Sequence, residues 1–152
     1  MPKAKPHPNQ LGFSFEQPRA ASEPAALAGL EARICRTVGI ILASDNRPRE
    51  IIAAEMSVLL EDDVSRAMLD AYSSPAREGH KVPMSRFFAL IAVTGRHDLL
   101  DPLLRKIGAA LLVGEEVHTA RLGQIDRQIE HLRNERKKLA GIAPLIRGDK
   151  NA

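Results

Sequence analysis

Aromatic residues and cysteine are scarce in this chain of 152 residues. Aromatics make up 3% of it, with one Tyr and no Trp. Ala, Leu and Ile must therefore supply most of the buried surface, which favours helices over sheets. The one cysteine, Cys35, excludes an intramolecular disulfide and fits a reducing compartment. It stands among apolar residues such as Ile34 and Val38, which favours a buried, inert thiol over a nucleophile.

Long apolar runs are also missing. No stretch approaches the ~18 apolar residues of a membrane-spanning helix, and the N-terminus lacks the apolar core of a signal peptide. We therefore expect a cytoplasmic protein that makes no membrane contact.

The sequence offers no motif for catalysis. It has no glycine-rich phosphate loop, and its five histidines are scattered without metal-ligand spacing beside a single cysteine. The acidic run Glu61-Asp62-Asp63 would suit a cation, but capping of a helix explains it more simply. We expect neither an enzyme nor a metal or cofactor site.

Charge and proline content set the N-terminal part apart from the rest. The net charge of +3 and the isoelectric point near 9.3 are compatible with a polyanionic partner. Residues 1–24 hold five of the ten prolines and show neither helical nor strand periodicity, which predicts a disordered arm. Two aromatics in this arm, Phe13 and Phe15, are either incidental or dock on the domain or on a protein partner.

Residues 25–114 have the pattern of a compact all-α domain. The run Ala109 to Val113 is ambiguous, because it suits either a short extended segment or the buried end of the domain. Outside residues 48–74, apolar spacing and stop signals predict three helices: residues 25–43 capped by Ser22, residues 84–94 ended by Gly95, and residues 99–107, with Asp101-Pro102 as a second possible start and Gly108 as the end.

The stretch from Pro48 to Ser74 holds two short helical patterns joined by an acidic turn. Asp45 or Asn46 is the expected cap of the first helix, and Asp62 or Asp63 that of the second. The apolar positions are Ile51, Ile52, Met56, Leu59 and Leu60 in the first helix, and Val64, Ala67, Met68 and Ala71 in the second.

These two patterns form the outline of a helix-turn-helix. In that motif a small residue of the first helix lets the second cross closely, and a buried β-branched residue anchors the second. Ala53 and Val64 suit these roles. The turn has no glycine and is about one residue longer than the tightest form. An ordinary αα-hairpin within a helical domain is the alternative.

A long C-terminal helix is predicted over residues 115–140, followed by a tail over 141–152 that begins at the helix-stopping Gly141. The apolar residues of this helix form a narrow stripe, and its other faces are charged. A stripe this narrow favours pairing with a second copy over packing back onto its own domain. Arg136 occupies one position of the seam. The apolar residues at alternating spacings of three and four, which we expect to form the oligomerisation seam, are Leu122, Ile125, Ile129, Leu132 and Leu139.

The segment from Arg49 to Gly114 resembles phage and prophage helix-turn-helix regulators of the lambda CII kind. The residues that carry the resemblance are EIIAAEMSVLLEDDVSRAMLDAYSS, followed by PMSRFFALIAVTGRHDLLDPLLRKIGAALLV. The resemblance covers the central half of the chain. It implies an all-helical, oligomeric, sequence-specific binder of double-stranded DNA, with Met84, Phe87 and Leu90 in structural roles.

The expected DNA interface centres on the second helix of the motif. Ser65 and Arg66 would reach base edges, and Leu69 would lie on the same groove-facing side. The residues expected to hold the phosphate backbone are Arg47, Arg49, Arg77, His80 and Lys81. The alternative function is a helical interaction or adaptor protein without catalysis, which would bind a protein through the C-terminal helix and the N-terminal arm.

Overall fold

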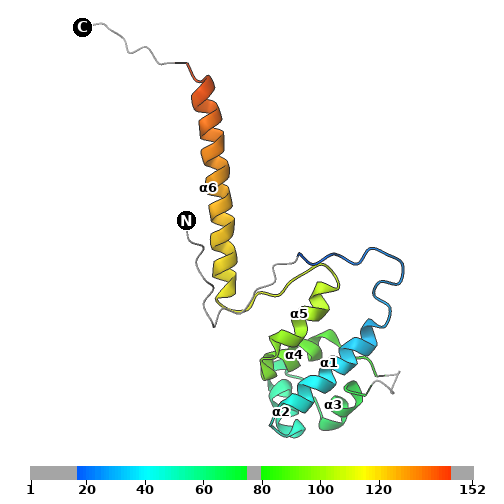
Figure 1. The fold of residues 1–152 in the computed structure, drawn as a ribbon. Coiled ribbons are helices and arrows are strands. Elements are labelled where there is room, and N and C mark those ends of the chain that lie inside the picture. Colours follow the sequence, from blue (N-terminus) through cyan, green and yellow to red (C-terminus); the bar gives the residue numbers. More distant parts are fainter. Residues whose placement is uncertain (1–16, 75–79, 145–152) are drawn as a thin grey trace, which may run out of the picture. The chain divides into compact units, whose positions relative to one another are not determined.

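The structure, a computed structural model, describes residues 17–74 and 80–144. The described residues contain helices and no strand, so the expected all-α class is confirmed. The N-terminal arm up to Glu16, with Phe13 and Phe15, lies outside the described residues, as do Arg77 and the end of the tail. The helices are α1 Leu30–Ser44, α2 Arg49–Leu60, α3 Arg66–Tyr72, α4 Met84–Thr94, α5 His97–Arg105 and α6 Glu116–Ile142 (Figure 1).

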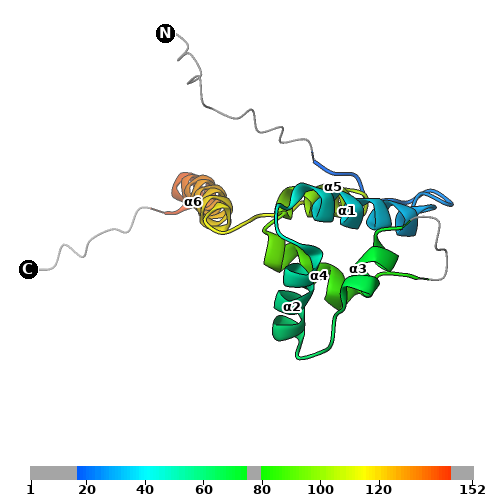
Figure 2. The same cartoon turned by 90° about the horizontal axis from the view of Figure 1, so that it is seen from below.

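The chain divides into two compact units. The helical unit reaches to Leu111 and contains α1 to α5, and the α6 unit begins at Leu112. In the helical unit α2 packs along α4, and α1 contacts both α3 and α5. Figure 2 shows the loop that leads from the end of α2 into α3.

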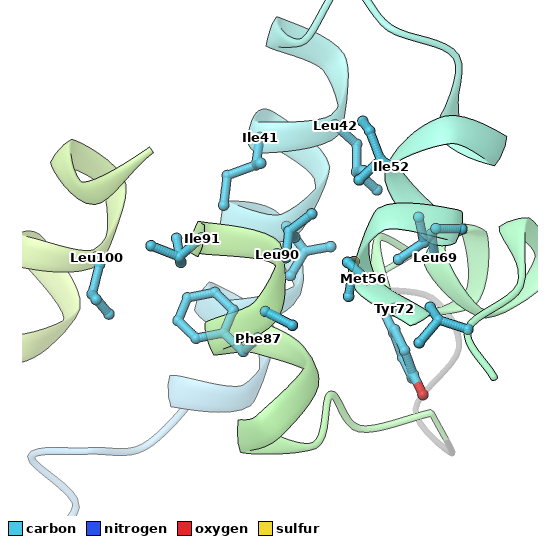
Figure 3. Close-up of a cluster of buried hydrophobic side chains, with 14 residues drawn as sticks. Ile41, Leu42, Ile52, Met56, Leu69, Tyr72, Phe87, Leu90, Ile91 and Leu100 are labelled. Carbon is cyan, nitrogen blue, oxygen red and sulfur yellow. The ribbon is translucent and has the colours of Figure 1, made fainter. Parts of the chain in front are cut away.

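Aliphatic side chains from all five helices of the helical unit form one core (Figure 3). Leu90 of α4 lies among side chains of α1 and α2. Tyr72, the only Tyr of the chain, belongs to the same core. This core is the expected result of a composition poor in aromatics, because helices bury aliphatic stripes efficiently. The side chains that are almost fully buried are Val38, Ile41, Ile52, Met56, Leu69 and Leu90.

The first helix begins later than the sequence predicted. Residues 23–29 form successive turns, and α1 starts only at Leu30. Ala25 and Gly29 have positive φ angles of 60° and 74°, a conformation that interrupts an α-helix. Gly29, and not Ser22, therefore precedes the helix. Helical spacing alone does not show where the backbone leaves the right-handed region.

The prediction for α4 is confirmed at both ends. The helix runs from Met84 to Thr94, and Gly95 follows with a φ of 67°. Its N–H donates to the Ile91 carbonyl, as expected for a left-handed C-cap. Phe87 is buried, whereas Met84 is 72% exposed and does not take the structural role expected of it. Met84 is the first residue of α4.

α5 begins at His97 and passes through Pro102, so the second possible start was wrong. Asp101 instead accepts a hydrogen bond of 2.9 Å from the Leu111 N–H and one of 2.6 Å from Arg105. The bond to the Leu111 N–H fastens the segment that follows α5. Residues 109–113 are neither helix nor strand, and Leu111 packs against the core.

Candidate nucleic-acid interface

α2 and α3 are locked together by small and β-branched residues at the predicted positions. Ala53 of α2 and Val64, just before α3, are both buried. Ser57 Oγ accepts a hydrogen bond of 2.9 Å from the Val64 N–H and donates one of 2.9 Å to the Ala53 carbonyl. This hydroxyl satisfies the buried N–H at the end of the loop and fixes the entry into α3.

The loop between α2 and α3 uses different residues from those predicted. Glu61 ends α2 in the left-handed region, at a φ of 49° and a ψ of 33°, where many helices carry glycine. Asp62 and Asp63 do not cap α3. Ser65 is the N-cap, and its side chain accepts a hydrogen bond of 3.2 Å from the Met68 N–H. The Ser65 oxygen therefore has a capping role that the sequence did not indicate, and its contact with base edges stays a prediction.

The exposed face of α3 differs from the predicted one. Leu69 is only 1% exposed and belongs to the core, so the expectation that it faces a groove was wrong. Ala67, expected to be buried, is exposed. In seven residues the apolar pattern is too short to fix the orientation of the helix, and packing on α1 and α2 decides it. Arg66 and Asp70 occupy the outer face, with side chains 60% and 42% exposed.

Acidic neighbours pair with Arg66 of α3 and with Arg49 of α2. Arg66 donates to Glu50 at 2.5 Å and lies 3.6 Å from Asp70, and Arg49 donates to Asp70 as well. The Glu50 carboxylate raises the pKa of Arg66. The pKa of Glu50 is lowered by its own backbone N–H and by Arg66. DNA would have to displace these carboxylates before either guanidinium bound a phosphate or a base.

Arg47 holds the junction between α1 and α2 together. Its guanidinium bonds Asp45 at 2.8 Å, Glu55 at 2.6 Å and the Val93 carbonyl at 3.1 Å. Hydrogen bonds from the Arg47 side chain and backbone N–H lower the pKa of Asp45 to about 2. Asp45 does not cap α2 as predicted, because the helix begins later, directly after Pro48. Arg47 has a structural role that the sequence did not reveal.

Arg86 of α4 is a further arginine that the sequence analysis missed. It donates to the Tyr72 hydroxyl at 2.5 Å, to Asp62 at 3.0 Å and to the Asp63 carbonyl at 3.4 Å. Asp62 and then the Tyr72 hydroxyl raise the pKa of Arg86. Arg86 thus neutralises part of the acidic loop and ties it to α4. The signal that could have indicated this role is the presence of a single arginine within an otherwise apolar helix.

Two further residues of the expected interface follow α3. His80 and Lys81 are both exposed, in the segment that leads into α4. Their contact with phosphates stays a prediction. The structure gives no geometry for Arg77.

The predicted seam of α6 is exposed along its whole length. Its five apolar side chains range from 38% exposed at Ile125 to 60% at Leu122 and Leu132. The described part of α6 contains no buried residue. The helix begins at Glu116 and ends at Ile142, so it passes the predicted stop at Gly141.

The part of the chain that the structure describes has neither a cluster of metal ligands nor a membrane-spanning helix. Within residues 17–74 and 80–144, no three His, Cys, Asp or Glu side chains are arranged to hold a metal ion. The described helices include none with the length and apolar character needed to cross a membrane. The comparison of this chain with protein-family models, with curated proteins and with solved structures found no match.

Proposed function

We propose that the chain is a homo-oligomeric, sequence-specific binder of double-stranded DNA, a cytoplasmic transcriptional regulator of the phage or mobile-element type. In this proposal α3 enters the major groove, and the α6 seam joins the copies. The observation that carries the proposal is the packing of α3 on α2. Ala53, Val64 and the Ser57 hydroxyl fix the crossing, and Arg66 is left outside at the start of α3.

Arg66 is the residue that we assign to base edges, because a guanidinium near the start of a recognition helix suits the acceptors of guanine. Arg49, His80 and Lys81 would contact phosphates, with Arg77 added from its sequence position alone. Arg47 contributes little to DNA binding in this proposal, because three partners hold it at the junction of α1 and α2. The paired carboxylates Glu50 and Asp70 make binding weak, because they compete with DNA for the guanidinium groups of Arg49 and Arg66.

The experiment is a selection of random duplex DNA by the full-length protein at two salt concentrations, followed by sequencing of the retained DNA. We expect a repeated or palindromic half-site, with retention falling steeply as salt rises. Arg66→Ala should weaken binding to the selected site about tenfold or more and relax its sequence preference. Arg36→Ala, on the exposed side of α1, is the matched control and should bind like the natural protein.

Two results would contradict the proposal. Retention without any sequence preference would be explained by the basic isoelectric point alone. Equal binding by the Arg66→Ala and Arg36→Ala variants would remove α3 from the interface.

A second candidate function is a protein-interaction or adaptor factor, favoured by the outer face of α2. Ile51 and Leu59 belong to the apolar positions predicted for this helix, and Val58 lies next to Leu59. All three side chains are exposed, Val58 at 77%. Exposed apolar side chains that gather on one helix mark contact surfaces. If this function is right, Arg66→Ala has no effect, whereas Val58→Asp and Ile129→Asp both abolish capture of the partner protein.

A further inference from the structure

The seam of α6 is nearly symmetric about its own midpoint. Leu122 and Leu139 lie equally far from the midpoint, between residues 130 and 131, and so do Ile129 and Leu132. Ile125 is matched in the same way by Arg136, the one charged residue in the seam. A helix with such a seam presents the same order of side chains to a partner that runs in the opposite direction.

The direction of a partner decides where Arg136 lies. In a parallel pair at equal register, each seam residue faces its own copy, so two Arg136 side chains would meet between apolar layers. In the antiparallel pair centred on the midpoint, Arg136 faces Ile125 of the second copy instead. Leu122 then meets Leu139, and Ile129 meets Leu132, so every apolar residue of the seam gains an apolar or aliphatic neighbour. Like charges side by side in a low-dielectric layer are costly, which favours the antiparallel pair.

Charges beside the seam agree with this direction. Asp126 directly follows Ile125, and Arg133 directly follows Leu132, so both flank the same side of the seam. The antiparallel pair brings Asp126 of each copy towards Arg133 of the other, which gives two attractive pairs related by the two-fold axis. In the parallel pair Asp126 would instead approach Arg121, which is attractive as well, so the position of Arg136 decides the direction and the flanking charges supply the means to test it.

We propose that α6 is an interface for a second copy of this chain, joined to it as an antiparallel two-stranded coiled coil centred between residues 130 and 131. The occupant is a second α6, because the seam and its flanking charges are complementary to themselves on reversal. The proposal does not depend on whether α3 binds DNA. With a rise of 1.5 Å per residue, Thr119 of the two copies lies about 35 Å apart in this arrangement, and roughly 10 Å apart in a parallel one.

Charge reversal tests the direction in the full-length protein, with the monomer–dimer equilibrium measured by sedimentation. Asp126→Arg places like charges against Arg133 and should weaken association about three- to tenfold. The double variant Asp126→Arg with Arg133→Asp should restore it. The matched control, Asp126→Arg with Arg121→Asp, should remain weak. Restoration by the control and not by the first double variant would overturn the antiparallel pairing in favour of the parallel one.

A distance measurement gives an independent result. Cys35→Ala removes the natural thiol, and Thr119→Cys then carries a spin label near the start of α6. A distance near 35 Å between labels is expected, and one below about 20 Å would overturn the direction. A protein that remains monomeric at all concentrations, with helical content unchanged in Ile129→Asp, would overturn the interface and, with it, the homo-oligomeric part of the proposed function. The DNA contacts proposed for α3 would still be decided by their own test.

Discussion

Glu61 holds a backbone conformation that its side chain disfavours, and we expect Glu61→Gly to stabilise the helical unit. The residue ends α2 at a φ of 49°, in the left-handed region. A Cβ atom approaches the neighbouring carbonyl oxygen in this region, whereas glycine has no Cβ and adopts the conformation freely. The carboxylate also lies at the negative end of the α2 dipole.

The expected gain follows from two opposing effects. A residue other than glycine in the left-handed region costs about 1–2 kcal/mol. Glycine removes this cost but lowers stability by about 0.4–1 kcal/mol, because it raises the conformational entropy of the unfolded chain. The net gain is about 0.5–1 kcal/mol. For a unit of this size such a gain raises Tm by about 2–6 °C.

The assay is thermal and urea unfolding of the full-length protein, followed by circular dichroism. Glu61→Gln is the matched control, because it removes the charge and keeps the Cβ. We expect it to gain a few tenths of a kcal/mol at most, from the helix dipole. If Glu61→Gly were no more stable than Glu61→Gln, backbone strain at this position would be refuted as a cost to the fold.

Two further predictions concern hydrogen bonds within the helical unit. Ser57→Ala should lower the free energy of unfolding by about 1–3 kcal/mol, because it leaves a buried N–H of the loop without its acceptor, and urea unfolding measures the loss. The bond between Asp45 and Arg47 predicts a dependence on pH. Since the pKa of Asp45 falls to about 2 in the folded protein, its contribution is complete above its ordinary pKa near 3.8 and disappears as the pH falls through 2. Unfolding of the natural protein and of Asp45→Asn from pH 5 to pH 2 should therefore show a constant difference down to about pH 4 that shrinks below it, and a difference unchanged at pH 2 would contradict this.

Local signals in the sequence predicted much of the fold. The bounds of α4 could be read from its apolar run and from Gly95, because a left-handed cap depends only on neighbouring residues. The long α6 and its seam were predicted for a similar reason, since a repeat of three and four over many turns defines one side of a helix. The start of α1 was missed, because turns at Ala25 and Gly29 leave helical spacing unchanged.

The candidate interface was harder to predict. Arg66 was correctly placed on the outside of α3, but Leu69 was not, because seven residues carry too little periodicity to orient a helix. The sequence predicted Arg47 as a DNA-binding residue, whereas in the structure it donates to the Val93 carbonyl, 46 residues away along the chain. The partners of Arg86 are likewise 14 to 24 residues distant in the chain.

The sequence by itself determined that this chain is helical, where α4 ends, and which apolar residues share one side of α6. These properties follow from interactions within a few residues along the chain. Only the tertiary structure decided which side of α3 is exposed and which arginines are already paired with carboxylates. The physical reason is that burial and ion pairing depend on distances between helices, and those distances are set by the packing of the whole core.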